Sequence, residues 1–271
     1  MSYTRLDATD IVISSDAVTA PAWSGNIPTL STFFTASSGV TSSFYIDVYN
    51  TSSSDINSAI QFSIAYGNAY GSGSAPLNTL IPTITPTRIN YGQYRNIIYG
   101  DNESFFNFGT GNTAATEVIA IAIDRNRYKE SILPGTFNLT LTSGSNTLKL
   151  TDNSNDITLV NYLDCGRVYD IVSGSNGSAQ STPLATGAPA IGYTNSGSYG
   201  LFLPDVGLIV LNPKALSAPA ANGGLNATFY RGIGTTAVNY ANNQQVYNII
   251  TAGASFKLNS KETISSDYIF V

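Results

Sequence analysis

The sequence contains no histidine, and this absence removes the side chain that most often carries protons at neutral pH. Ser-His-Asp and Cys-His catalytic arrangements are therefore excluded, as are zinc sites built on histidine. The single cysteine, Cys165, has no second cysteine in the chain with which to form a disulfide. We therefore expect a protein that is not an enzyme, with no catalytic residue, no cofactor and no bound metal ion.

Charged residues are also scarce, at 11% of the chain, where about 25% is usual. The net charge is −5 and the 12 lysines and arginines form no basic run, so the sequence predicts no nucleic-acid binding. The longest apolar run, residues 118–123, is far shorter than the roughly 18 residues that a membrane-spanning helix needs. We accordingly expect no membrane span, and the polar start MSYTRLDATD favours synthesis in the cytoplasm.

Uncharged polar residues are abundant instead: serine, threonine and asparagine together make up roughly a third of the chain. A polar but uncharged surface loses little solvation when it meets a partner. This composition is typical of a protein that its neighbours cover in an assembly. The alternative is an exported protein whose surface is polar but uncharged.

Short segments rich in β-branched and aromatic residues, separated by polar turn clusters, dominate the chain. Residues 137–142 and 147–150 alternate apolar and polar side chains on either side of the turn cluster 143–146, which predicts a hairpin. Further strands are predicted at residues 43–49, 60–65, 118–123, 156–162, 207–211, 246–251, 255–258 and 267–271. Because residues 267–271 remain β-prone to the last position, we expect them to pair in a sheet and the encoded polypeptide to continue further.

Helical signals are few. Asn212 followed by Pro213 predicts an N-cap and a single turn, residues 124–133 predict one or two turns, and residues 88–99 fit helix and strand equally weakly. The predicted fold is mostly β: one or two antiparallel β-sandwich-like domains with long Gly/Ser/Asn/Tyr-rich loops and few short helices.

We expect two regions along the chain. Residues 1–112 form an N-terminal β region with an extended arm, and residues 113–271 form a hairpin-rich β domain. The polar stretches at residues 65–86 and 173–200 are longer than ordinary loops, and we expect them to be arms that contact other subunits more than their own core.

Five tyrosines are clustered among glycine, serine and asparagine in the first half of the chain. They are Tyr66, Tyr70, Tyr91, Tyr94 and Tyr99. Tyrosine beside small polar residues gives binding surfaces a large contact area at low entropic cost, which predicts contacts with a protein partner. Two alternatives stay open: the tyrosines belong to the core and strand faces of a β protein, or they are aromatic platforms for sugars.

Several segments together resemble virion structural proteins of T-even-like contractile-tailed bacteriophages that infect cyanobacteria. They are residues 66–76 (YGNAYGSGSAP), 91–101 (YGQYRNIIYGD), 122–130 followed by LPG at 133–135, and 198–205 (SYGLFLPD). The resemblance implies a non-enzymatic subunit of a phage particle, in the tail or baseplate, that is assembled in the host cytoplasm. Its partners would be other virion proteins, in homo- and hetero-oligomeric contacts. The alternative functions are a tail adhesin that binds a host-surface glycan and a polysaccharide-cleaving enzyme of the tail.

Overall fold

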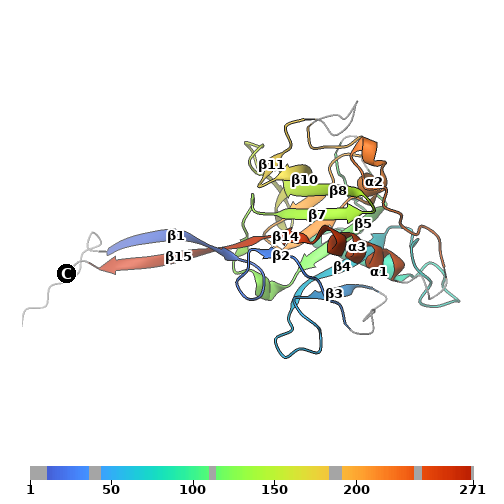
Figure 1. Cartoon of the computed structure of the whole chain (residues 1–271), viewed down its shortest axis with the longest axis horizontal. Helices are drawn as coiled ribbons and strands as arrows, with labels where there is room; N and C mark the ends of the chain where they lie inside the picture. Colours follow the sequence, from blue (N-terminus) through green and yellow to red (C-terminus); the bar gives the residue numbers. More distant parts are fainter. Residues whose placement is uncertain (1–10, 37–43, 110–113, 183–190, 235–239, 270–271) are drawn as a thin grey trace, which may run out of the picture.

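The computed structural model describes residues 11–36, 44–109, 114–182, 191–234 and 240–269, and in them strand clearly exceeds helix, so the fold is mostly β, as predicted (Figure 1). The strands are β1 (Ile11–Pro21), β2 (Thr29–Leu30), β3 (Ile46–Tyr49), β4 (Ile60–Asn68), β5 (Glu117–Ile123), β6 (Ser131–Ile132), β7 (Asn138–Ser143), β8 (Asn146–Asp152), β9 (Asn161–Leu163), β10 (Gly166–Ser175), β11 (Ser178–Ala179), β12 (Gly200–Leu203), β13 (Leu208–Leu211), β14 (Ser255–Lys257) and β15 (Asn259–Ile269). The helices are α1 (Pro86–Tyr99), α2 (Pro213–Ser217) and α3 (Ala241–Gly253), with 3-10 turns η2 (Arg125–Arg127) and η3 (Ala220–Asn222).

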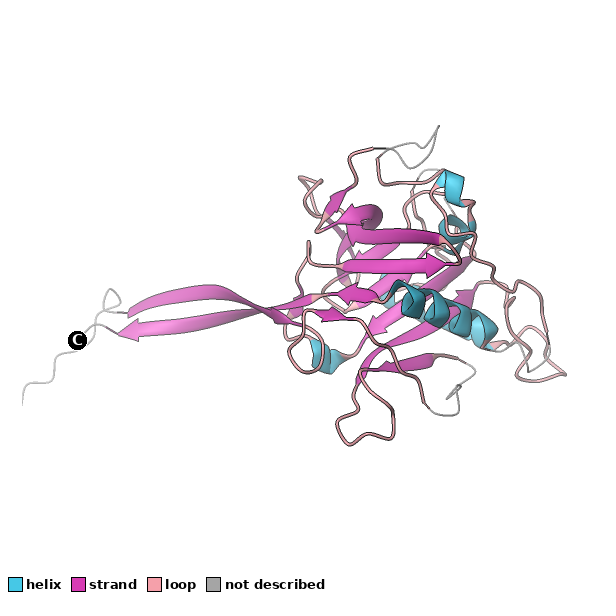
Figure 2. Cartoon of the chain, viewed as in Figure 1, coloured by secondary structure: helices cyan, strands magenta, loops and turns pink. Residues whose placement is uncertain are grey.

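A single antiparallel sheet of twelve strands forms the body of the molecule (Figure 2). Its order is β2-β14-β7-β8-β10-β12-β13-β5-β4-β3, with β9 and β11 paired to β10. The sheet curls until its ends meet, since the rings of Phe62 on β4 and Phe256 on β14 lie 5.3 Å apart. Helix α3 contacts both β7 and β4 and so covers the opening between the two ends. The result is the sandwich-like β fold that the sequence predicts.

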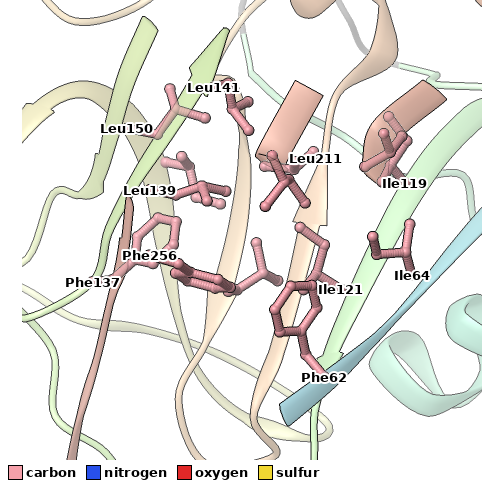
Figure 3. Packing of buried hydrophobic residues seen from close by; sticks show 14 of the residues in the cluster. Phe62, Ile64, Ile119, Ile121, Phe137, Leu139, Leu141, Leu150, Leu211 and Phe256 are labelled. Carbon is pink, nitrogen blue, oxygen red and sulfur yellow. The ribbon is translucent and has the colours of Figure 1, made fainter. Parts of the chain in front are cut away.

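The inner face of this curled sheet holds the larger hydrophobic core (Figure 3). Leu139 and Leu141 point into it from β7, while Ile119 and Ile121 point into it from β5. Each pair is spaced two residues apart, as the period of a strand requires. Trp23 closes one side, where its Nε1 donates a hydrogen bond of 2.6 Å to the carbonyl oxygen of Phe256.

A second core lies on the outer face of the central strands, under α1. Tyr91 and Ile98 of the helix belong to the same buried cluster as Val118 of β5 and Val210 of β13. Strands β5 and β13 are therefore covered on both faces, which explains why they are continuous apolar runs instead of alternating ones. Thr85 caps α1 by accepting a hydrogen bond from the backbone N–H of Arg88. The segment 88–99, which fitted helix and strand equally weakly, is thus helical.

The strongest local predictions are confirmed. β7 and β8 form the predicted hairpin, closed by the pair Ser143↔Asn146. Asn212 caps α2 through its side chain, with Pro213 in the first turn. The predicted strand at 246–251 is wrong, because these residues belong to α3. Their apolar members are spaced three and four residues apart, and α3 turns them toward the core.

The two predicted regions share one sheet, because β4 lies before residue 112 and β5 after it, and they pair from Phe62↔Ile123 to Asn68↔Glu117. The stretch 65–86 is not simply an extended arm. It begins within β4, and Ser74 and Ala75 are buried in the chain's own interior. In the stretch 173–200, residues 183–190 lie outside the described residues. The sequence predicts that residues 267–271 pair in a sheet. β15 is paired as far as Ile269, and residues 270 and 271 lie outside the described part of the chain.

Candidate functional site

A two-stranded ribbon extends from the body at one end of the molecule (Figure 1). β1 and β15 pair antiparallel along their whole length, from Ile11↔Ile269 to Pro21↔Asn259. β6 adds a third strand only at the base, where Ser260 and Lys261 of β15 are paired with it. The eight residues of β15 beyond Lys261 span about 27 Å at the usual rise of a strand. Over this length the ribbon has no further strand among the described residues.

The ribbon is expected to have little stability of its own in water. An isolated two-stranded pair is marginally stable at best, and its outer edges carry N–H and C=O groups that another strand can use. β1 and β15 come from opposite ends of the described chain, so no turn holds them together at the outer end. Beyond Lys261, the outer edges of the ribbon are open along the residues that the structure describes.

One face of the ribbon combines apolar and acidic side chains. Val18 lies opposite Glu262, and Ile264 lies opposite Asp16, so the register places all four on the same face. Val18 is 43% exposed and Ile264 is 44% exposed. The opposite face carries small and polar residues, such as Thr19 paired with Lys261. The face with Val18 and Ile264 is hereafter called the apolar face of the ribbon.

Residues 77–84 form a second exposed feature, which we call the apolar loop. It lies before α1, on the side of the body away from the ribbon (Figure 1). The loop has a defined shape, because the backbone N–H of Leu77 donates to the carbonyl oxygen of Ile84 at 2.8 Å. Leu80 at its tip is 88% exposed, and Ile81 is also exposed. Exposed apolar side chains gathered in this way are typical of contact surfaces.

The five tyrosines predicted as partner contacts do not form one surface. Tyr66 and Tyr91 are buried in the chain's own cores, which corrects the prediction for these two. The Tyr66 hydroxyl donates to Oε2 of Glu117 at 2.8 Å, and burial raises the pKa of Tyr91 to about 12. Tyr94 and Tyr99 are half-buried, whereas Tyr70 is 66% exposed. Partner contact stays a prediction for these three.

Tyr99 does contribute to a different feature, an open hollow of about 560 Å³ beside β9 and β10. Tyr162 and Tyr193 also line it, together with the carboxylate-bearing residue Asp170. This hollow, called here the tyrosine hollow, brings together residues that are far apart in the sequence. No spacing in the sequence marked them as a group.

Comparisons with family models, curated proteins and solved structures find no match to this chain. In the described part of the chain, no helix is long and apolar enough to cross a membrane. The same residues contain no group of three or more acidic or cysteine side chains placed to hold a metal ion.

Cys165 has the environment of a structural thiol. Burial raises its pKa, and the nearby carboxylates of Asp164 and Asp205 raise it further, so the thiol stays protonated at neutral pH. Arg167, the cation nearest in sequence, is engaged elsewhere, since its side chain forms an ion pair with Asp205. The residues around Cys165 therefore do not activate it as a nucleophile.

Sequence reasoning missed most of the ribbon. It predicted a strand at residues 267–271 but none at β1, although Ile11-Val12-Ile13 is a short β-prone run. The remainder of β1, through Ser14-Ser15-Asp16, has the composition of a turn. A signal existed in Val18, Ile264 and the threonines around them. It is weak because the side chains of residues 15–20 are all exposed, so burial imposes no strict alternation on that part of β1.

Proposed function

We propose that this chain is a non-enzymatic structural subunit of a bacteriophage particle, placed in the tail or baseplate and acting through protein–protein contacts. The observation that carries the proposal is the ribbon, which lacks the support of a third strand beyond Lys261 among the described residues. The low share of charged residues in the chain and the resemblance of several segments to virion structural proteins support it further. Its sequence contains none of the histidine-based catalytic arrangements.

The partner of the ribbon is proposed to be a second copy of this chain, because most soluble oligomers are built from identical subunits. The ribbon and the apolar loop lie on opposite sides of the body (Figure 1). A head-to-tail arrangement brings the apolar face of one ribbon, with Val18 and Ile264, toward the loop end of the next copy. Repeated contacts of this kind close into rings or continue as filaments.

The first test replaces Val18 and Ile264 together by aspartate. The change puts two new charges beside Asp16 and Glu262 on the apolar face of the ribbon. We expect the unchanged protein to associate as its concentration rises and the double variant to associate at least tenfold more weakly, a loss of about 1.4 kcal/mol. Sedimentation velocity over a range of protein concentrations measures the association of the unchanged protein and of the double variant. Leu80→Asp in the apolar loop is expected to weaken association in the same way.

Ile56→Asp is the matched control, since Ile56 is 98% exposed on a loop that belongs to neither proposed surface. This variant is expected to associate like the unchanged protein. Two results would refute the proposed contact: an unchanged protein that stays monomeric at every concentration, or a Val18→Asp/Ile264→Asp variant that associates normally.

A second candidate function is that of a tail adhesin that binds a host-surface glycan. The observation that favours it is the tyrosine hollow, which Tyr99, Tyr162 and Tyr193 line together with Asp170. Binding of sugar to the purified protein tests this candidate without any assembly.

A further inference from the structure

Helix α1 carries positive charge and no acidic residue. It follows the apolar loop directly and lies in the half of the body away from the ribbon (Figure 1). Arg88 and Arg95 are the charged residues among its 14 positions. Arg88 is exposed, and its Nη1 donates a hydrogen bond of 3.3 Å to the carbonyl oxygen of Thr83 in the loop. Neither of the two salt bridges among the described residues involves Arg88, so its charge has no carboxylate partner there.

The outward face of α1 is otherwise apolar or neutral. Ile89 is 41% exposed and Ile97 is 45% exposed. Gln93 joins Ile89 and Ile97 into one row, because residues four apart are neighbours on a helix surface. Gly92 follows Arg88 in the adjacent row in the same way. The face thus combines an unpaired cation with exposed apolar side chains, and it continues into the apolar loop.

Gly92 leaves an open position on this face that the chain itself does not fill. A Cβ added there would meet no atom within 4 Å, so packing inside the chain does not require a glycine. Glycine inside a helix is also less stable than alanine. A glycine at this position is explained if a bulky side chain of another copy comes close to the helix in an assembly.

The apolar face of the ribbon is complementary to α1 in charge. Its charged residues are the acidic Asp16 and Glu262. Asp16 is exposed and belongs to neither salt bridge of the described residues. Glu262 lines a hollow with Arg127 and Lys129 of its own chain. Asp16 is therefore the acidic residue better placed to pair with another copy.

The spacing of the two surfaces agrees as well. Asp16 and Ile264 are paired across the ribbon, and the Cβ atoms of such a pair are about 4.5–5.5 Å apart. Arg88 and Gly92 are four residues apart on the helix, which separates these positions by about 5–6 Å. One ribbon can therefore bring Asp16 to the guanidinium of Arg88 and Ile264 to the open position at Gly92 together. The 14 residues of α1 span about 21 Å, so the helix also matches much of the length of the ribbon.

A second copy of α1 is a poorer partner for this face. It would bring Arg88 and Arg95 of one helix toward the same arginines of the other, and like charges at an interface are unfavourable. The ribbon brings the opposite charge. We propose that the outward face of α1 receives the ribbon of the next copy, with Asp16 paired to Arg88 and Ile264 packed over Gly92. This inference rests on the ribbon contact proposed above and deepens it by naming the other half of that contact.

The test is a charge swap in the full chain, measured by sedimentation velocity over a range of protein concentrations. Arg88→Glu and Asp16→Arg each replace an attraction by a repulsion, and we expect each alone to weaken association roughly fivefold or more. The double variant Arg88→Glu/Asp16→Arg restores opposite charges and is expected to associate within about twofold of the unchanged chain. Gly92→Gln fills the open position and is expected to weaken association roughly fivefold or more.

Lys214→Glu is the matched control, because it makes the same change of charge at an exposed residue of α2, outside both surfaces. It is expected to associate like the unchanged chain. Thermal unfolding of each variant shows whether it is folded. If Arg88→Glu unfolds, Arg88→Gln takes its place, because removing the cation should relieve the defect of Asp16→Arg.

The outcomes separate this inference from the ribbon contact itself. If Val18→Asp/Ile264→Asp weakens association while Arg88→Glu and Gly92→Gln do not, the ribbon contact stands and α1 is not the surface that receives it. The inference is also wrong if the charge-swapped double variant associates no better than the single variants. If Arg88→Glu alone strengthens association, α1 meets another copy of itself instead. An unchanged chain that stays monomeric at every concentration refutes the ribbon contact and this inference with it.

Discussion

Replacing Phe256 by alanine is expected to lower the free energy of unfolding by about 3–5 kcal/mol. Phe256 is fully buried where the two ends of the curled sheet meet. Its ring lies 4.8 Å from that of Trp23 and 5.3 Å from that of Phe62, both edge to face. The truncation removes the transfer free energy of the ring and leaves a cavity between strands that other residues cannot easily close.

The position of Phe256 makes the effect larger than that of an ordinary core residue. Phe62 comes from β4 and Phe256 from β14, so their contact joins strands at opposite ends of the sheet order. Few ion pairs support the fold, since charged residues are scarce and the described residues contain two salt bridges. Packing of this kind must therefore supply most of the stability.

Equilibrium unfolding in urea, followed by tyrosine and tryptophan fluorescence, measures the loss. Phe105→Ala is the control, because Phe105 is partly exposed and its ring lies at the edge of the second core, 6.4 Å from that of Tyr91. We expect the control to lose less than about 1.5 kcal/mol. Equal losses in the two variants would show that the junction at Phe256 does not hold the curled sheet closed.

The elements that sequence reasoning predicted correctly are those whose signals are local. The hairpin of β7 and β8 depends on alternation and a turn between neighbouring strands, and the cap of α2 depends on Asn212 and Pro213. α3 was misread because 246–251 (VYNIIT) is rich in β-branched residues, which strands favour. Burial of one helix face against β7 and β4 overrides that preference.

The ribbon could not be predicted from local patterns, because it pairs residues at opposite ends of the chain, such as Ile11 and Ile269. The tyrosine prediction failed in part for a different reason. Glycine near Tyr66 was taken as a sign of a loop, but Gly67 lies in β4, and a Cβ there would lie 2.9 Å from the backbone N of Tyr91. The glycine permits α1 to pack closely on the strand, and this buries Tyr91. Tyr66 points to the opposite face of β4 and is buried in the larger core.

Gly253→Ala is expected to destabilise the protein by about 2–3 kcal/mol, although alanine is normally the better helix former. Gly253 is the last residue of α3, where the helix passes directly over β7. A Cβ added there would lie 1.9 Å from the carbonyl oxygen of Thr140, which is backbone and cannot rotate away. The helix must therefore shift outward, and Ile249 and Ile250 on its buried face lose contacts in the core.

Gly92→Ala is the matched control within α1 and is expected to have the opposite sign. A Cβ at Gly92 meets nothing within 4 Å, so the substitution adds no clash. It removes the entropic cost of a glycine inside a helix and should stabilise the protein by roughly 0.5–1 kcal/mol.

The two glycine variants are compared by thermal and urea unfolding under the same conditions. A lower midpoint for Gly253→Ala together with a higher one for Gly92→Ala is the expected pattern. Helix propensity alone would raise the unfolding midpoints of both variants. A lower midpoint for Gly253→Ala therefore shows the effect of the close approach of α3 to β7. If Gly253→Ala proves as stable as the unchanged chain, the backbone of α3 does not approach Thr140 of β7 this closely. That result would contradict the conclusion that α3 covers the opening between the two ends of the sheet.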